Sequence, residues 1–437
     1  MIAIKDTGAL ELTNKFSVDE SIALQLDLED PLSEYRDHFY FPGNGTIYFD
    51  GNSLGLFSKE AEQSLLKIIK DWKELGILGW YKPKNSWFYF GEDLGAKAAP
   101  LVGAEPEEVV ATGTTTVNLH SLVSTFYHPE EGKRTKIIAD ELDFPTDIYA
   151  LKSQIKLKGL DPKEHLILIP SNDGRTIDED KIIKRMDDDV ALILLPSALY
   201  RSGQLFNMEY ITKAANDRNI PIGWDCSHSV GVVPHKFDEW GIDFAFWCSY
   251  KYLNSGPGGT GFLYLNRKHF EKEPGLAGWF GYEKARQFDM SLDFNHAKSA
   301  GGWQISSSSI LCSAPIEGAL NLHLKAGIHN IRKKSIHLTE YLIYLVDNLL
   351  TKDPYNFRIG TPRNPAKRSG HIAIEHDTEA RRINECLRIY HNVISDFRPP
   401  NVIRMAPIAL YNQYHEIWLV AQHLKQIIDE KEYEKIE

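Results

Sequence analysis

Lys251 lies where an apolar stretch of the chain opens into a glycine-rich loop. Residues 242–248 read IDFAFWC, a short run that predicts a buried strand, and glycines follow beyond Asn254. A lysine at such a place must be paired, have a depressed pKa, or serve covalently as an amine, because an unpaired buried cation is costly. The amine could form a Schiff base with a carbonyl cofactor, whereas the simpler interpretation is a loop lysine that reaches water.

A second candidate for chemistry is the hydroxyl-rich turn at residues 113–116, which reads GTTT and precedes a helical pattern over 117–127. Backbone N–H groups and hydroxyls at a helix N-terminus bind anions, and a phosphate is the expected occupant. The same residues also make an ordinary helix cap. This turn on its own therefore leaves both interpretations open.

Strand and helix patterns alternate regularly around these two segments. Apolar strand patterns lie at 108–112, 136–140, 165–169, 190–195, 220–225 and 242–248, with helical patterns between most of them. Such repeated units predict an α/β fold with a mostly parallel sheet, which binds ligands beyond the carboxyl ends of its strands. The side chains at or just after a predicted strand end are Thr115, Phe144, Asp147, Ser197, Asp225, His228 and Lys251.

These strand-end residues meet the requirements of a pyridoxal phosphate site. Such a site needs an amine for the aldehyde, a carboxylate beside the pyridine nitrogen, a ring that stacks on the cofactor, and a phosphate cradle. Lys251, Asp225, a ring from Phe144 or His228, and residues 113–116 supply them in turn. Asp225 alone also reads as a helix cap and His228 as a core histidine, so the hypothesis depends on their convergence.

The composition narrows the class of protein. A chain of 437 residues can bury a large core in about two or three structural units. The formal net charge of -11 argues against nucleic acid or an anionic membrane as a main partner. No apolar stretch approaches a membrane span and the N-terminus lacks a signal-like apolar run, so a cytoplasmic location is expected. The four widely spaced cysteines form neither a disulfide framework nor a zinc pattern, and no metal site is expected.

Weaker patterns suggest how the rest of the chain is divided. A helical pattern over 58–75 begins at a probable cap, Ser58, and the aromatic-rich segment 80–90 contains Trp80, which could line a pocket for a flat ligand or a subunit interface. The predicted units are an N-terminal segment packing on the main body (1–45), a large cofactor-binding α/β domain (46–315), a long connecting helix (316–350) and a small C-terminal α+β domain (351–437).

Several motifs closely resemble those of the kynureninase family. They are WDCSHSVG at 224–231, DEWGIDFA at 238–245, WCSYKYLN at 247–254 and GWFG at 278–281, with further matches at 51–56, 116–120, 144–147 and 404–412. Kynureninases are fold-type I pyridoxal phosphate enzymes, in the group of class V aminotransferases and cysteine desulfurases. The resemblance therefore implies this fold, with a large α/β domain and a small C-terminal α+β domain.

The resemblance also implies a role for each candidate residue. Lys251 would carry the cofactor as a Schiff base, Asp225 would pair with the pyridine nitrogen, and Tyr250 would transfer protons beside the lysine. Phe144 would stack on the cofactor ring, and Arg404 would clamp the substrate carboxylate bidentately. Ser53 and Trp80 would lie near the substrate. The remaining cofactor-binding residues would be Thr115, Thr116, Asp147, Ser197 and His228, with Trp279 and Ser307 supplied by the second subunit of a homodimer.

The implied reaction is hydrolysis of the Cβ–Cγ bond of L-kynurenine or 3-hydroxy-L-kynurenine. The products would be L-alanine and anthranilate or 3-hydroxyanthranilate, in tryptophan catabolism and the supply of NAD precursors. Ser307 and Ser308 stand where many members have Asn or Thr and then Pro, and Trp80 stands near a histidine of animal forms, so the choice between the two substrates stays open.

Three alternatives to this reaction stay open as well. One is a related enzyme with a shifted substrate. Another is a cysteine desulfurase, which needs an exposed cysteine on a mobile loop, a requirement that neither Cys312 nor Cys386 fits well. The third is a non-catalytic scaffold, and the intact Lys251 and Asp225 count against it.

Overall fold

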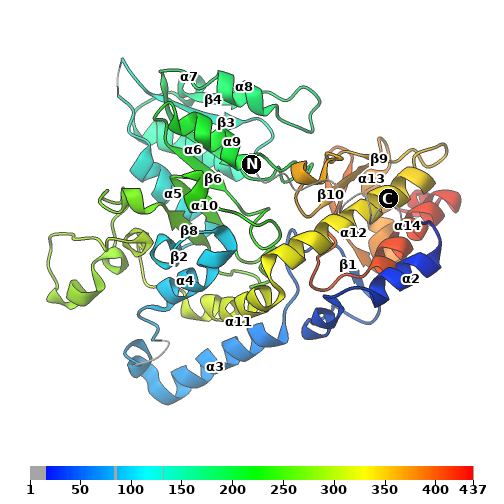
Figure 1. Cartoon of the computed structure of the whole chain (residues 1–437), viewed down its shortest axis with the longest axis horizontal. Helices are drawn as coiled ribbons and strands as arrows, with labels where there is room; N and C mark the ends of the chain where they lie inside the picture. Colours follow the sequence, from blue (N-terminus) through cyan, green and yellow to red (C-terminus); the bar gives the residue numbers. More distant parts are fainter. Residues whose placement is uncertain (1–15, 83–85, 131, 437) are drawn as a thin grey trace.

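A seven-stranded sheet forms the centre of the larger part of the molecule (Figure 1). The computed structural model describes residues 16–82, 86–130 and 132–436. The strand order is β2-β8-β7-β6-β5-β3-β4, and the pairings are parallel except that β8 runs antiparallel to both of its neighbours. The predicted mostly parallel sheet is confirmed. The strands are β2 (Val109–Ala111), β3 (Lys136–Asp140), β4 (Leu166–Ile169), β5 (Val190–Pro196), β6 (Ile222–Asp225), β7 (Phe244–Trp247) and β8 (Phe262–Leu265).

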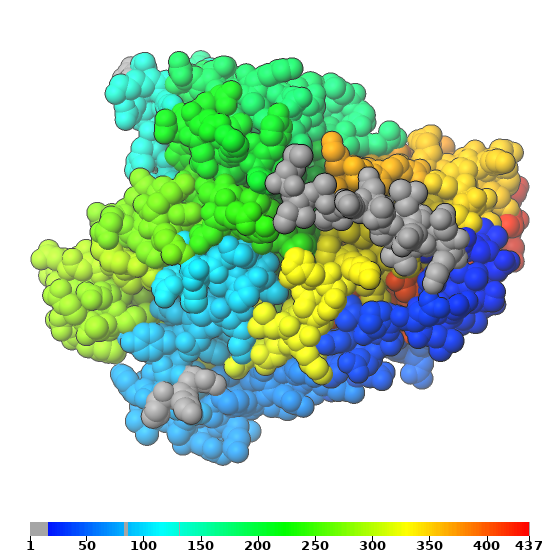
Figure 2. Space-filling view, in the orientation of Figure 1, coloured from blue at the N-terminus to red at the C-terminus, as the bar shows by residue number. Residues whose placement is uncertain are grey.

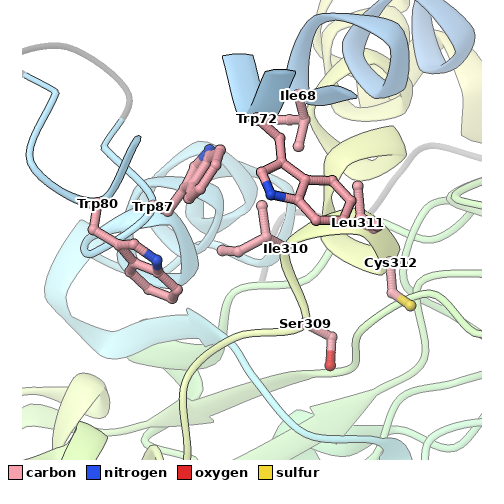
Figure 3. Close-up of a pocket in the computed structure, with 8 residues that line it drawn as sticks. All are labelled: Ile68, Trp72, Trp80, Trp87, Ser309, Ile310, Leu311 and Cys312. Carbon is pink, nitrogen blue, oxygen red and sulfur yellow. The ribbon is translucent and has the colours of Figure 1, made fainter. Parts of the chain in front are cut away.

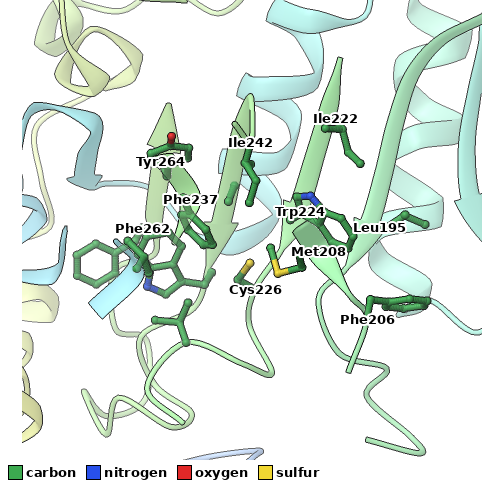
Figure 4. Close-up of a cluster of buried hydrophobic side chains, with 14 of the residues drawn as sticks. Leu195, Phe206, Met208, Ile222, Trp224, Cys226, Phe237, Ile242, Phe262 and Tyr264 are labelled. Atoms are coloured by element: carbon green, nitrogen blue, oxygen red, sulfur yellow. The ribbon is translucent and has the colours of Figure 1, made fainter. Parts of the chain in front are cut away.

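Helices pack on both faces of this sheet, so alternate residues of a strand enter different hydrophobic clusters. On β7, Ala245 and Trp247 join the cluster that contains Trp224 and is shown in Figure 4, whereas Phe244 and Phe246 join a second cluster. Strands buried on both faces are apolar at successive positions, which explains the continuous apolar runs in the sequence. The first cluster includes residues of α4 (Phe90–Val102), α8 (Glu179–Lys184), α9 (Met208–Asn216) and α10 (Phe237–Trp240). The second cluster includes residues of α5 (Thr115–Phe126) and α6 (Pro145–Leu157). The short helix α7 (Pro162–His165) precedes β4.

The C-terminal part contains a separate antiparallel sheet of four strands, in the order β12-β13-β10-β9. Its inner residues, such as Ile374 and Ile403, are fully buried against helices in one hydrophobic cluster. Strands and helices segregated in this way make the small α+β unit that the sequence predicts. Its elements are β9 (Arg358–Ile359), β10 (Ile372–Glu375), α13 (Ala380–Tyr390), β11 (Val393–Ile394), β12 (Asp396–Arg398), β13 (Val402–Met405) and α14 (Tyr414–Asp429).

Two helices, not one, connect the two sheets. The helical pattern over 316–350 belongs to α11 (Ile310–Ala326) and α12 (Ile328–Leu349), which meet at Gly327 with φ +79°. A residue with positive φ cannot continue an α-helix, and glycine adopts such a conformation without steric cost. α11 packs along α3 (Lys59–Leu75), whose predicted cap is confirmed because the Ser58 hydroxyl accepts from the Ala61 N–H. Within the described ranges, no helix is long and apolar enough to cross a membrane.

The N-terminal segment lies on the C-terminal part of the chain. Helix α2 (Glu20–Leu28) packs on α14, and β1 (Ile47–Tyr48) pairs in parallel with β11. In the space-filling view this segment, in dark blue, lies against the yellow and orange C-terminal residues (Figure 2). The strand expected to open the large domain therefore pairs with the C-terminal part instead. Residues 1–15 of the predicted segment lie outside the described residues.

Candidate active site

The turn that carries Lys251 is held by a second segment from far away in the sequence. Lys251 follows β7, and its carbonyl accepts from the backbone N–H of Asn254, which has φ +57°. The N–H of Gly55 donates to the Tyr250 carbonyl at 2.8 Å. A Cβ at position 55 would lie 2.4 Å from the Lys251 carbonyl oxygen, so only glycine fits there. The turn at 51–56 thus directly supports the turn that carries Lys251.

Lys251 points to a neutral histidine. Its Nζ lies 3.0 Å from Nε2 of His228, which follows the end of β6. Burial, with the nearby Lys251 charge as a further cause, holds the pKa of His228 well below its usual value. His228 therefore accepts a hydrogen bond from the lysine amine. Its Nδ1 is buried and has no partner among the described residues, which leaves one polar atom for a ligand.

A group of buried carboxyls lies at the ends of β3 and β6. Asp225 ends β6, and Asp147 lies in the first turn of α6. Burial raises the pKa of Asp147 well above its usual value, and the charge of Asp225 and a hydrogen bond between the two side chains raise it further. Burial and its acidic neighbours raise the pKa of Asp143 in the same way. Oδ2 of Asp143 and of Asp147 is buried without a partner in the described part of the chain.

This site fits pyridoxal phosphate. A ring nitrogen that carries a proton would give the buried Asp225 and Asp147 carboxyls the cationic donor that they lack. Phe144, beside them at the start of α6, is 44% exposed and so leaves ring surface available for stacking. Thr114 caps α5 without a side-chain hydrogen bond, which leaves the first N–H groups of that helix to an anion such as a phosphate. Thr115 and Thr116, in its first turn, are half-buried.

Ser197 contacts the strand end that carries Asp225, and Tyr250 is adjacent to Lys251. The N–H of Ser197 donates to the Asp225 carbonyl at 2.7 Å, and its hydroxyl lies 2.6 Å from the Ser229 hydroxyl. Ser197 therefore fixes the strand end that carries Asp225. Tyr250 precedes the lysine, and burial raises the pKa of its phenol, which keeps the hydroxyl protonated.

Arg404 brings the C-terminal sheet to this region. It lies on β13, is 1% exposed, and donates to Asp396, to the Ser53 hydroxyl and to the Tyr200 carbonyl. Arg404 and Ser53 were each expected at the substrate, and in the structure they lie 3.0 Å apart. Asp396 was not identified from the sequence, since no motif marks that residue and its contact depends on strand pairing.

The other three predicted residues are half-buried or exposed on this chain. Trp80 lines an apolar pocket of about 340 Å³ between α3 and the start of α11, together with Trp72 and Trp87 (Figure 3). The lining of this pocket contains none of the residues around Lys251. Trp279 is 49% exposed, and Ser307 is exposed as well.

A further residue near the lysine is His371, which the sequence analysis missed. It is fully buried just before β10, with Nδ1 3.2 Å from the Tyr252 hydroxyl and its ring 5.6 Å from that of His228. Burial lowers its pKa to about 3. Its signal in the sequence was weak, because a lone histidine before a strand is usually a core residue.

Known proteins resemble this chain in sequence over nearly its whole length. It is 54% identical over 430 residues to the kynureninase of Geobacillus thermodenitrificans, covering 98% of each chain. It is 53% identical over 415 residues to the kynureninase of Bacillus thuringiensis subsp. konkukian, covering 95% of this chain and 96% of that one. Residues 331–424 match the family described as the kynureninase C-terminal domain.

Solved structures resemble the chain in fold. A cysteine desulfurase from Thermococcus onnurineus superposes with a TM-score of 0.75 at 19% identity, covering 89% of this chain and 96% of that one. A cysteine desulfurase from Escherichia coli gives 0.74 at 15% identity, covering 91% and 98%. These identities support the fold alone, and the predicted fold-type I class is confirmed. The high identity to curated relatives along almost the entire sequence shows that the chain belongs to the kynureninase family.

Proposed function

We propose that this chain is a pyridoxal-phosphate-dependent kynureninase, which hydrolyses the Cβ–Cγ bond of L-kynurenine or its 3-hydroxy derivative to L-alanine and the matching anthranilate. The observation that carries the proposal is the identity above 50% to kynureninases along nearly the whole chain. The enzyme class and the cofactor expected from the motifs are thereby confirmed. The roles of individual residues are our proposal, supported by their positions around Lys251.

Lys251, Asp225, Asp147 and Phe144 would hold the cofactor ring, and the first turn of α5 with Thr115 would hold its phosphate. When bound, pyridoxal phosphate supplies an electron sink for carbanion chemistry at the substrate. Burial and the charge of Asp225 raise the pKa of Asp147, so a protonated Asp147 would leave a single carboxylate, that of Asp225, to pair with a protonated ring nitrogen.

The protein's own groups move protons around the lysine. The neutral His228 accepts from the Lys251 amine and orients it, and because its pKa is so low it adds no competing positive charge. The Lys251 amine can take a proton from the substrate when it is free, which is the general-base role we assign to it. The Tyr250 hydroxyl, whose pKa is raised by burial, stays protonated and can donate a proton during release of the aromatic product.

Substrate binding would use both sheets and two subunits. Arg404 and Ser53 would bind the substrate α-carboxylate, since a guanidinium matches a carboxylate in geometry and charge. Trp80 would lie near the aromatic ring of the substrate. Trp279 and Ser307, exposed on a single chain, would complete the neighbouring site of a homodimer.

Cysteine desulfurases share this fold, so the cysteines of this chain are candidates for a nucleophile. Cys312 is exposed, but it lies in the first turn of α11, where it lines the pocket beside Trp72. Cys226, Cys248 and Cys386 are buried. A desulfurase needs its nucleophilic cysteine on a mobile loop, so none of the four positions favours that reaction.

The test is turnover by the purified protein supplied with pyridoxal phosphate. L-kynurenine and 3-hydroxy-L-kynurenine are offered separately, and alanine and both anthranilates are measured, with Lys251→Ala as the inactive control. We expect alanine and an anthranilate in equal amounts from at least one substrate, and their loss in the variant. A protein that binds the cofactor and cleaves neither compound would refute the assignment of substrate.

A further inference from the structure

Arg404, to which the proposed function assigns the substrate carboxylate, is already paired with a carboxylate of its own chain. Its Nε lies 3.3 Å from Oδ1 of Asp396, and its Nη2 lies 2.7 Å from Oδ2. Both side chains are largely withdrawn from water, with 1% of Arg404 and 12% of Asp396 exposed. Asp396 therefore occupies one edge of the guanidinium, the edge formed by Nε and Nη2.

The remaining donors of Arg404 are distributed over the other edge. A guanidinium carries five N–H groups. Nη2 also donates to the Ser53 hydroxyl at 3.0 Å, and Nη1 donates to the Tyr200 carbonyl at 2.7 Å. Among the described residues this leaves one Nη1 N–H without a protein acceptor. A carboxylate at the terminal edge, formed by Nη1 and Nη2, would accept from this N–H and replace the Ser53 hydroxyl as the acceptor from Nη2.

The register of the sheet makes the contact with Asp396 a permanent feature. β12 and β13 are antiparallel, and Asp396 lies directly opposite Arg404 in their pairing. Directly opposed side chains lie on the same face of the sheet with their Cβ atoms close together. The carboxylate can leave the guanidinium only if its side chain rotates away from this partner.

A second arginine also holds Asp396, through the oxygen that accepts from Nη2 of Arg404. Nη2 of Arg398 donates to Oδ2 of Asp396 at 2.6 Å, and Arg398 lies two residues further along the same strand, hence on the same face. The Ser53 hydroxyl donates to the same carboxylate at 3.1 Å. Besides Arg404, two donors thus hold Asp396, so its carboxylate has a fixed position against which Arg404 is oriented.

We propose that Asp396 is a positioning residue for substrate recognition, which holds the Nε edge of Arg404 so that the terminal edge faces the α-carboxylate of the amino-acid substrate. This inference rests on the carboxylate-binding role of Arg404 in the proposed function. In the alternative role, the Asp396 carboxylate would compete with the substrate carboxylate for Arg404 and would have to move away before the substrate binds. The two roles predict opposite effects on affinity. Removal of the Asp396 charge weakens carboxylate binding if Asp396 positions Arg404, and strengthens it if Asp396 competes with the substrate.

The experiment compares holoenzymes of the parent, Asp396→Asn and the control Asp347→Asn. Asp347 forms a similar two-bonded pair with Arg363, on the exposed side of α12. L-alanine and ethylamine, which share an amine but differ in the carboxylate, are titrated against the visible absorption of the bound cofactor. A charge-assisted hydrogen bond implies a roughly tenfold to hundredfold loss of alanine affinity in Asp396→Asn.

Ethylamine affinity should stay at the parent value in Asp396→Asn, and KM for L-kynurenine should rise far more than kcat falls. Asp347→Asn should leave all these values unchanged. Alanine binding as tight as in the parent, or tighter, would overturn the proposal, as would an equal loss for ethylamine. Asp396→Ser replaces the asparagine variant if that one does not fold. The titrations need no turnover, so they decide this point even if the parent cleaves no kynurenine.

Discussion

The Gly55→Ala substitution tests whether the turn at 51–56 holds Lys251 in the position that its proposed catalytic role needs. The added Cβ would lie 2.1 Å from Asn254 Oδ1 and 2.4 Å from the Lys251 carbonyl oxygen. Because ordinary contacts need at least about 3.4 Å, the lysine turn has to move by about 1 Å. A displacement of this size at a reacting group lowers the rate about a hundredfold. Overpacking of the site should also cost about 1–3 kcal/mol of the free energy of unfolding.

The assay is kcat for L-kynurenine together with the visible spectrum of the bound cofactor. We expect a kcat lower by about two orders of magnitude and a shifted absorption band, in a protein that still folds. Gly159→Ala is the matched control, since that glycine has φ +78° and no atoms within 4 Å of an added Cβ. It should cost about 1–2 kcal/mol of stability and leave the spectrum unchanged. A Gly55→Ala enzyme with the parent kcat and spectrum would show that the turn at 51–56 does not hold Lys251 in position.

Three further predictions concern stability and the cofactor. His371 has a pKa of about 3 in the folded protein and about 6.5 when unfolded, so it lowers stability as the pH falls below 6.5. Between pH 6 and pH 5, the free energy of unfolding should therefore fall by about 1 kcal/mol less in His371→Gln than in the parent, as measured by urea unfolding. The same pH dependence in both proteins would contradict this. Lys334→Met leaves Asp30, its partner at 2.6 Å, buried and unpaired. The cost should be about 3–5 kcal/mol, largely restored in the double variant Lys334→Met/Asp30→Leu; thermal unfolding decides. Phe144→Ala should weaken cofactor binding about threefold to tenfold in equilibrium dialysis if the ring stacks, and not at all if it does not.

The strands of the large sheet could be predicted because burial on both faces makes each one a continuous apolar run, as at residues 190–195. β8 was missed, since its four residues follow a glycine-rich loop and one of its two partners, β2, lies about 150 positions earlier in the chain. α4 was missed because it contains Gly91, Gly95 and Pro100, which are poor helix formers. Gly95 is nevertheless required, because a Cβ there would lie 2.0 Å from the Val109 carbonyl oxygen.

Long-range pairing also explains what the sequence could not assign. β1 is two residues long, and its partner β11 follows about 345 positions later, so no local pattern places it in the C-terminal part. Lys251, Asp225 and Arg404 could be named from strand ends and motifs, but the contact of Asp396 with Arg404 depends on the register of β12 and β13. The acidic group around Asp147 shows the same dependence: two of its members come from separate strand ends, and their mutual effect on pKa exists only after folding.

Lys251 is the residue that we propose carries the cofactor. This assignment is tested by reduction of the holoenzyme with borohydride, digestion, and mass spectrometry of the peptides. We expect one phosphopyridoxyl group per chain, attached to the peptide that contains Lys251, and none in the Lys251→Ala protein. A label on a different lysine, or a cofactor lost without any label, would contradict it.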